Sequence, residues 1–311
     1  MAAAHLLSGD LVAFPTETVY GLGADACNST AVARIYEVKG RPSDHPLIVH
    51  IATMDRMGDW AQEIPEYAIK LARDFWPGPM TLVLKRSKLA GDFITGGQDT
   101  VGVRVPDHAV ALSLLTAFEK LGGKGVAAPS ANRFGHVSPT NAAAVVEELS
   151  SYLSENDIVL DGGACMVGVE STIIDCTGTT PRILRPGAIS ELMIKECTGL
   201  LCAEFKPQAT IGEDIRVSGS LENHYAPAAK VFLDNTPLPG QGFIADTKIE
   251  TPEGVIRLAE PANNEEFARL LYSALRKADA QGLVEVVVAQ PNGTGIAVAI
   301  RDRLARAANG R

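Results

Sequence analysis

Basic and hydroxyl side chains are concentrated in a few short segments that also contain glycine or proline. The segment EVKGRPSDHPLIVHI, residues 37–51, contains Lys39, Arg41, His45 and His50. A loop with several cations needs an anion to offset their repulsion. Phosphates fit this need, because arginine contacts them bidentately and lysine supplies a point charge. The segment therefore indicates a phosphate site just before an apolar run.

Other polar residues lie inside or just after apolar runs. Arg104 alternates with valines in VGVRVP, so an inward-pointing side chain requires a carboxylate or an anionic ligand. Ser130 and Asn132 follow GVAAP, at the strand end where open α/β sheets bind ligands. Thr140 is predicted to cap the next helix, whose free N–H groups attract anions. The remaining candidates are Thr16, Glu17, Thr18, Thr100, Ser171, Thr172 and Arg185.

This set of residue types suits phosphoryl or nucleotidyl transfer, in which catalysis depends on positioning and charge stabilisation. No segment contains a Walker loop, a G-x-S-x-G motif or an H-E-x-x-H motif. Gly21-x-Gly23-x-x-Ala26 matches a dinucleotide fingerprint only superficially, because Pro15 to Tyr20 separate it from the preceding strand. Tight turns or close backbone approach explain its glycines better.

Each segment also has a plain structural explanation. Lys39 can interact with the dipole of the helix that it ends, and His50 can be a satisfied core residue. Thr16 to Thr18 can form a polar turn, and Ser130 and Asn132 can be turn residues. The recurrence of such residues at several strand ends favours a shared ligand site.

Strands and helices alternate through about residue 200, which predicts α/β layers, and a late cluster of strands predicts a mixed sheet. Ser29 or Thr30 is expected to cap the helix that Gly40 ends. Strands are predicted at 11–15, 46–51, 80–85, 101–106, 125–130, 157–163, 171–176 and 181–187, and helices at 29–40, 63–76, 108–123, 140–151 and 190–199.

The chain is predicted to contain two domains. Residues 1–203 form the first, residues 204–228 are a polar linker or covering loop, and residues 229–311 form a small α/β domain. Asn263 or Asn264 should cap the first helix of the second domain. The predicted elements there are strands at 229–233, 242–246, 254–259 and 284–291, and helices at 263–282 and 295–310.

Composition excludes several classes of protein. The formal charge of -9 over 311 residues is unfavourable for general nucleic-acid binding, which needs clustered Lys and Arg. The five cysteines are odd in number and form no C-x-x-C, so we expect neither a disulfide framework nor a zinc site, and a cytoplasmic location. No apolar run is long enough for a membrane span.

Seven segments occur in the order found in YrdC-type threonylcarbamoyl-AMP synthases, which the chain resembles over about residues 5–200. The K-x-R motif of Lys39 and Arg41, together with the S-x-N motif of Ser130 and Asn132, is the hallmark of that family. The tetrapeptide HYAP (224–227) and the C-terminal segment resemble the longer, two-domain Sua-type branch. The seven segments are FPTETVYGLGADA, VKGRPSDHPLIVHI, WPGPMTLVL, VGVRVP, PSANRFGHVSPT, GVESTIID and ILRPG.

The resemblance implies a reaction in which L-threonine, bicarbonate and ATP give threonylcarbamoyl-adenylate and pyrophosphate. A separate transferase complex then passes the threonylcarbamoyl group to an adenosine beside the tRNA anticodon. The resemblance implies double-stranded RNA binding as a family property, and Mg²⁺ accompanying ATP without a protein metal site. It also implies an open, twisted mixed sheet around a large basic cavity, with helices outside, and a small Rossmann-like C-terminal domain.

The resemblance also implies a role for each candidate residue. Lys39 and Arg41 are expected to be catalytic at the triphosphate end of the cavity. His45 departs from the family pattern, since two-domain members often have asparagine there. Tyr225 lies in the predicted linker, which we expect to cover the cavity mouth and exclude water. L-threonine is expected to contact Thr18, His50, Arg104, Ser130 and Ser171. ATP is expected to contact Lys39, Arg41, His45, Thr100, Asn132, Thr140, Arg185 and Tyr225.

Three other functions compete with this one. The first is a non-catalytic RNA-binding module, which the acidic net charge disfavours. The second is a carbamoyl-adenylating maturation enzyme, but such proteins add zinc-finger segments, and this chain has no paired C-x-x-C. The third is a paralogue with a different substrate, which the intact K-x-R and S-x-N motifs disfavour.

Overall fold

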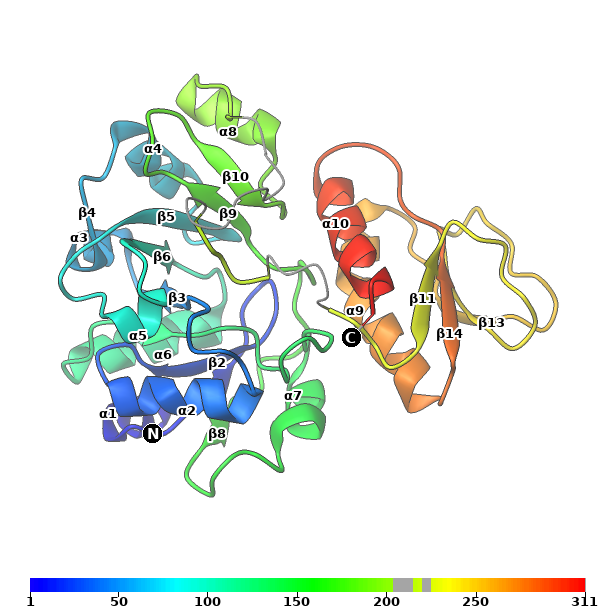
Figure 1. The fold of residues 1–311 in the computed structure, drawn as a ribbon, viewed down its shortest axis with the longest axis horizontal. Coiled ribbons are helices and arrows are strands. Elements are labelled where there is room, and N and C mark those ends of the chain that lie inside the picture. Colours follow the sequence, from blue (N-terminus) through cyan, green and yellow to red (C-terminus); the bar gives the residue numbers. More distant parts are fainter. Residues whose placement is uncertain (204–214, 220–224, 311) are drawn as a thin grey trace.

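Two bodies of unequal size make up the computed structural model (Figure 1). It describes residues 1–203, 215–219 and 225–310. Most of the predicted linker, 204–228, lies outside the described residues. Each body contains one β-sheet. No helix among the described residues is long and apolar enough to cross a membrane.

The larger sheet is mixed, as the sequence predicts. In the described residues its order is β10-β9-β5-β6-β3-β7-β2-β1-β8, with β4 pairing β5. Strands β5 and β9, β3 and β6, and β1 and β8 pair in parallel, and the other pairs are antiparallel. The strands are β1 (Val12–Phe14), β2 (Gly21–Asp25), β3 (Ile48–His50), β4 (Ala61–Gln62), β5 (Met80–Arg86), β6 (Thr100–Arg104), β7 (Val126–Ala127), β8 (Ile158–Val159), β9 (Thr172–Asp175) and β10 (Arg182–Arg185).

Helices surround this sheet (Figure 1). The buried residues Val32, Ile35 and Val38 give α2 an apolar face that packs on the core. The helices are α1 (Ala2–Ser8), α2 (Ser29–Lys39), the short 3-10 helix η1 (Met54–Arg56), α3 (Met57–Trp60), α4 (Glu66–Phe75), α5 (Asp92–Thr95), α6 (Ala109–Lys120), α7 (Ala142–Leu149) and α8 (Glu191–Thr198).

Two predicted helix caps are wrong by one or two residues. Asn28, not Ser29 or Thr30, caps α2, because its side chain accepts from the N–H groups of Thr30 and Ala31. Asn141, not Thr140, caps α7 by accepting from the Ala144 N–H at 2.8 Å. Gly40 ends α2 as predicted, with a φ of 61°.

The glycine-rich segment forms a strand that the sequence analysis missed. Gly21 and Gly23 lie within β2, not in tight turns. The predicted close approach does occur at Gly23, where an added Cβ would lie 2.7 Å from the Val126 side chain and 2.9 Å from that of Phe14. Glycine is therefore needed at this position for packing between strands. Strands at 125–130 and 157–163 are also shorter than predicted, because only Val126–Ala127 and Ile158–Val159 form ladders.

The smaller body, which we call the C-terminal unit, contains a parallel sheet in the order β11-β14-β12-β13. Helices α9 and α10 lie between this sheet and the larger body (Figure 1). One apolar cluster joins residues of both bodies, among them Val19 and Val169 of the first and Leu271 and Ile300 of the second. The elements are β11 (Lys230–Leu233), β12 (Gly242–Ile244), β13 (Ile256–Ala259), α9 (Asn264–Ala280), β14 (Glu285–Val288) and α10 (Ile296–Ala308). Asn263 caps α9.

Candidate active site

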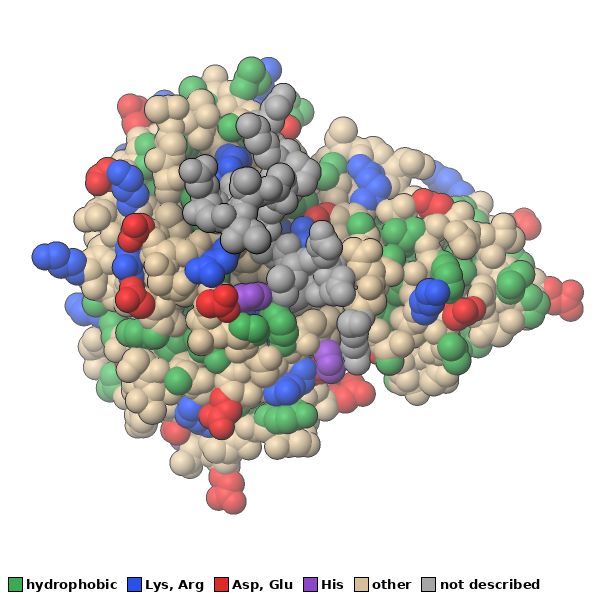
Figure 2. All heavy atoms as spheres, in the orientation of Figure 1, with side chains coloured by type: hydrophobic (Ala, Val, Ile, Leu, Met, Phe, Trp, Pro, Cys, Tyr) green, Lys and Arg blue, Asp and Glu red, His purple; other side chains and the backbone are tan. Residues whose placement is uncertain are grey.

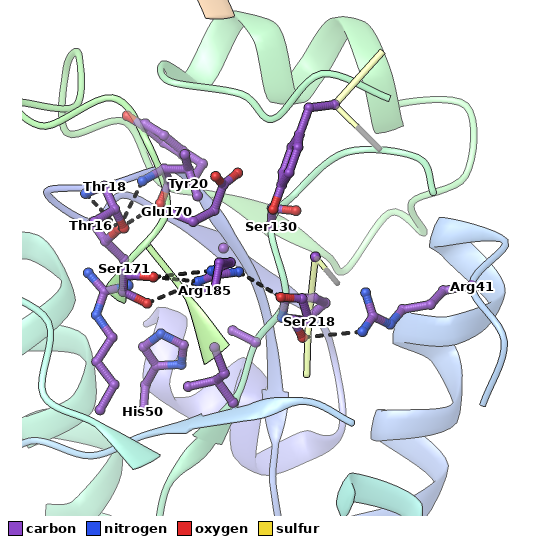
Figure 3. A pocket seen from close by; sticks show the side chains of 18 residues that line it. Thr16, Thr18, Tyr20, Arg41, His50, Ser130, Glu170, Ser171, Arg185 and Ser218 are labelled. Atoms are coloured by element: carbon purple, nitrogen blue, oxygen red, sulfur yellow. Dashed lines mark hydrogen bonds between the residues drawn. The ribbon is translucent and has the colours of Figure 1, made fainter. Parts of the chain in front are cut away.

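A cavity of about 530 Å³, counting the part that is open to solvent, lies where several strands of the larger sheet end. Strand β3 ends at His50 and β6 ends at Arg104, while Ser130 follows β7. Ser171 precedes β9 and Arg185 ends β10. The fold thus brings to one place side chains that are far apart in sequence (Figure 3).

The cavity contains only part of the predicted site. All five residues predicted to contact threonine line it, namely Thr18, His50, Arg104, Ser130 and Ser171. Of the residues predicted to contact ATP, Arg41, Arg185 and Tyr225 line it. Those that do not line it are Lys39, His45, Thr100, Asn132 and Thr140.

Arg104 is buried and already has a carboxylate partner. Its Nη2 atom lies 2.7 Å from Oε1 of Glu17, and its Nε donates to the Gly78 carbonyl at 3.3 Å. The sequence required a carboxylate or an anionic ligand for this arginine but did not identify Glu17 as the partner. The pair fixes the guanidinium at the end of β6, where it can also meet a ligand carboxylate.

Hydroxyl groups border the same part of the cavity. Thr16 and Thr18 share a hydrogen bond of 2.8 Å between their hydroxyls, and Ser171 shares one of 2.8 Å with Thr81. Arg185 donates to both the carbonyl and the hydroxyl of Ser171, at 2.9 and 3.1 Å. These contacts orient hydroxyls that could hydrogen-bond a small polar substrate.

Lys39 is buried next to Ser130, which lines the cavity, and it joins the two signature motifs. Its ammonium donates to the Ser130 carbonyl at 2.6 Å and also to the Asn132 carbonyl. The Asn132 amide in turn donates to the carbonyls of Arg133 and His136, at 2.7 and 2.9 Å. Burial, followed by the charge of Arg41, lowers the pKa of Lys39 well below its usual value. A nearby anion would oppose this shift by stabilising the ammonium.

Arg41 and Arg185 approach Ser218 from opposite sides (Figure 3). Arg41 donates to the Ser218 hydroxyl at 3.2 Å, and Arg185 donates to the Ser218 carbonyl at 2.9 Å. Burial lowers the pKa of Arg41 to about 10. Two buried guanidinium groups that converge on oxygen atoms form a position suited to an anionic ligand.

The other predicted ATP contacts lie around this cavity. The ring of His45 packs edge-on against Phe134, with 5.4 Å between centroids, and burial lowers its pKa. Thr100 begins β6 and lines an adjacent pocket that Val217 and Ser218 also line. Thr140 is buried, and its carbonyl accepts from the Cys165 N–H at 2.9 Å.

Glu170 lines the cavity, although the sequence analysis did not select it. Ser138 donates to its Oε1 at 2.6 Å, and Tyr272 and Arg303 donate to its Oε2 at 2.9 and 2.8 Å. Burial raises its pKa, but the charges of Arg303 and Arg185 and these hydrogen bonds outweigh burial and lower it to about 2. Its place in GVESTIID, beside Ser171, was the one sequence signal available.

His50 should make stability depend on pH. Burial, followed by the charge of Arg104, lowers its pKa to about 3, from 6.5 in the unfolded chain. Below 6.5 the unfolded chain binds a proton that the folded chain does not, so stability is lost as pH falls toward 3. We expect this residue to lower the free energy of unfolding by about 1.4 kcal/mol per pH unit in that window.

Urea unfolding at about pH 7 and about pH 5.5 checks this prediction, with His50→Gln as the comparison. The variant should lose about 1.4 kcal/mol less than the native chain between the two conditions. Equal losses in both proteins would show that His50 is not a buried neutral group.

The described residues contain no group of three or more His, Cys, Asp or Glu side chains that could hold a metal ion. Glu170 lines the cavity, but Ser138, Tyr272 and Arg303 already hydrogen-bond both of its oxygens. A divalent cation in this cavity would therefore draw its ligands mainly from a bound phosphate and water.

Comparison with known proteins gives matches over nearly the whole chain. The family model described as "Telomere recombination" matches residues 4–187, and the model described as "Threonylcarbamoyl-AMP synthase, C-terminal domain" matches residues 189–309. The threonylcarbamoyl-AMP synthase of Pyrococcus abyssi is 40% identical, covering 100% of this chain and 94% of the relative. That of Bacillus subtilis is 38% identical, covering 100% and 92%.

A solved structure gives a similar result for the fold. The crystal structure of P. abyssi Sua5 complexed with L-threonine superposes with a TM-score of 0.88 at 39% identity, covering 99% of this chain and 93% of the other. The two-body architecture described above is therefore shared with that protein.

Proposed function

The chain belongs to the threonylcarbamoyl-AMP synthase family, and from this we propose that it converts L-threonine, bicarbonate and ATP into threonylcarbamoyl-adenylate and pyrophosphate. The observation that carries the proposal is the convergence of eight predicted substrate contacts on one cavity. An arginine and several hydroxyls gather on one side, where they suit an amino acid. Arg185 lies between these groups and Arg41, with hydrogen bonds to Ser171 on one side and Ser218 on the other, and the two guanidinium groups suit phosphates (Figure 3).

We assign the threonine site to the Arg104 side of the cavity. Arg104 binds the substrate carboxylate while Glu17 holds the guanidinium in place. Hydroxyls of Thr18, Ser130 and Ser171 and the neutral ring of His50 surround the rest of the amino acid. This polarity selects a small amino acid with a hydroxyl, because a site built to hydrogen-bond a hydroxyl rejects analogues that lack one.

Nucleotidyl transfer then follows in two steps. The threonine amine attacks the carbon of bicarbonate, and loss of water leaves a carbamate. A carbamate oxygen attacks the α-phosphorus of ATP, the bond to the β-phosphate oxygen breaks, and pyrophosphate leaves with the electron pair. Lys39 and Arg41 stabilise the charge on the phosphates. The remaining ATP contacts in this proposal are His45, Thr100, Asn132, Thr140, Arg185 and Tyr225.

Mg²⁺ enters this scheme bound to the ATP phosphates. When bound, it would offset negative charge on the triphosphate.

The product implies a downstream partner. An adenylate of threonylcarbamate is an activated acyl donor, and we propose that a separate transferase complex uses it to modify the adenosine beside the tRNA anticodon. The activity is accordingly placed in the cytoplasm, where ATP and tRNA meet, without a membrane partner. Contact with tRNA is indirect in this proposal.

Lys and Arg side chains are interspersed with Asp and Glu over the visible face (Figure 2), which disfavours an RNA-binding module.

Pyrophosphate release by the purified protein tests the proposal. Release should require ATP, L-threonine and bicarbonate together, and L-serine and L-valine should support it poorly. Release that does not depend on threonine, or no release despite ATP binding, would contradict the substrate assignment while leaving the fold unaffected.

Tyr225 should limit unproductive hydrolysis. Its ring is buried at the cavity wall, beside the described residues Ser218 and Gly219. We expect Tyr225→Ala to weaken ATP binding or raise threonine-independent ATP hydrolysis by about tenfold, because water gains access to the bound triphosphate. ATP titration and phosphate release measure both effects. Tyr225→Phe, which keeps the ring, is the comparison and should change these quantities less than Tyr225→Ala does. Unchanged kinetics in the alanine variant would contradict this role.

A further inference from the structure

The C-terminal unit reaches the wall of the cavity through two buried side chains. Tyr272 of α9 and Arg303 of α10 are 0% and 1% exposed, respectively. Both contact Glu170, which lines the cavity from the larger body. A charged network of this kind is costly to bury unless every group has a partner, and here both oxygens of Glu170 do.

Arg303 contacts two separate segments of the larger body. Its Nε donates to Glu170 Oε2 at 2.8 Å, and its Nη2 donates to the Pro186 carbonyl at 2.9 Å. Glu170 is followed directly by Ser171, and Pro186 is preceded directly by Arg185. One guanidinium of the C-terminal unit therefore fixes the neighbours of two residues that line the cavity.

The same two side chains support Tyr225. Its ring stacks on that of Tyr272, with centroids 5.7 Å apart and an angle of 24° between the planes. The guanidinium of Arg303 lies 5.3 Å from the centroid of the Tyr225 ring. Tyr225 has a φ of 61°, a conformation that is unfavourable for a residue with a bulky side chain, so packing against the C-terminal unit must help to hold it.

We infer that Arg303 is a positioning residue of the active site and that Tyr272 assists it. Through Glu170, Pro186 and Tyr225 they set the positions of Ser171, Arg185 and the aromatic wall. The C-terminal unit is then a structural part of the catalytic site and not only an appended module. This inference rests on the proposed function for its substrates, since Ser171 and Arg185 are assigned there to threonine and ATP.

Electrostatics gives Arg303 a second reason to be present. Glu170 is a carboxylate in the wall of a cavity proposed to bind a triphosphate, and an unpaired carboxylate there would repel it. Arg303 neutralises Glu170, and the low pKa of Glu170 agrees with that pairing. Arg185, whose charge also acts on Glu170, lines the cavity and hydrogen-bonds Ser171 and Ser218.

A simpler explanation is that Arg303 only joins the two bodies. Arg276 allows the two explanations to be separated, because it also bridges them. It lies on α9 and donates to Glu148 at 3.1 Å and to the Val137 carbonyl. Neither Glu148 nor Val137 lines the cavity. Glu148 also accepts from the Arg133 N–H and pairs with His136, so it keeps these two contacts beside Asn132 when lysine replaces Arg276.

The experiment compares Arg303→Lys and Tyr272→Phe with the matched variant Arg276→Lys. Lysine keeps the positive charge at position 303. Its single ammonium lacks the planar guanidinium geometry with which Arg303 contacts Glu170 and the Pro186 carbonyl at the same time. Melting midpoints are recorded first. Steady-state pyrophosphate release then gives kcat and the KM values for threonine and ATP, and calorimetry gives the ATP dissociation constant.

We expect kcat/KM to fall by about tenfold or more in Arg303→Lys and by a smaller factor in Tyr272→Phe, because small displacements of binding groups have large kinetic effects. Arg276→Lys should stay within about twofold at a similar melting midpoint. If Arg303→Lys matches Arg276→Lys in kcat/KM and ATP affinity, Arg303 acts only in docking and the inference is wrong.

The experiment also separates this inference from the proposed function. If the native protein fails to release pyrophosphate in response to threonine and bicarbonate, the proposed function fails. The inference then still predicts weaker ATP binding in Arg303→Lys than in Arg276→Lys, and equal ATP affinities would overturn it.

Discussion

Replacement of Lys39 with alanine is expected to lower threonine-dependent pyrophosphate release by about 10²- to 10³-fold, the usual cost of losing one preorganised electrostatic contact. Two losses combine in this variant. The phosphates lose a buried positive charge, and the loop carrying Ser130 and Asn132 loses the ammonium that holds two of its carbonyls. The main effect should be on kcat, because charge on the phosphates changes most in the transition state.

Initial rates at saturating substrates check this prediction. The melting midpoint of the variant is recorded as well, because alanine removes the cost of burying an ammonium but leaves the carbonyls of Ser130 and Asn132 without this donor. Lys85→Ala is the control, since Lys85 is half-exposed and pairs with Glu63 away from the cavity. A kcat for Lys39→Ala within about tenfold of native would contradict a catalytic role.

The location of the site could be predicted because strand ends are visible in the sequence. Arg104 alternates with valines, and an arginine that points inward from such a strand requires a buried partner. Ser130 follows an apolar run that proved to be β7. The sequence does not say how far apart two strand ends lie along the sheet edge. The strand pattern therefore does not show that Thr100 and Thr140, which the family resemblance assigns to ATP, lie outside the lining of the main cavity.

Local ambiguity explains the incorrect caps. Asn28, Ser29 and Thr30 are all good N-cap residues, as are Thr140 and Asn141. The backbone decides among them. Asn141 has an extended conformation, with φ -152° and ψ 166°, so its side chain reaches the free N–H of Ala144. Composition alone contains no information on that angle.

Long-range partners were the larger omission. Glu17 pairs with Arg104, and Glu170 pairs with Arg303 across 133 residues of sequence. A buried arginine implies that an acid is nearby, but in a chain with 37 acidic residues it does not say which one. Only the packing of α9 and α10 against the larger body shows that the C-terminal unit supplies Arg303.

The pair of Glu17 and Arg104 permits a test that separates substrate binding from stability. Arg104→Met should lower kcat/KM for threonine by about 10²-fold or more, because the substrate carboxylate loses its guanidinium. It should also lower the free energy of unfolding by about 3–5 kcal/mol, because Glu17 is left buried without its cation. Urea unfolding and initial rates at varied threonine concentrations measure the two losses.

Adding Glu17→Gln to Arg104→Met should restore most of the lost stability and none of the lost activity. A neutral amide removes the unpaired buried charge, which is the source of the destabilisation, but supplies no cation for a carboxylate ligand. Arg56→Met is the control, since Arg56 is half-exposed and distant from the cavity, and it should change neither quantity appreciably.

If the double variant recovers threonine-dependent turnover, Arg104 serves the fold alone and the substrate carboxylate binds elsewhere. If Arg104→Met keeps native stability, the ion pair does not compensate a buried charge, and the account of why arginine occupies this strand is wrong.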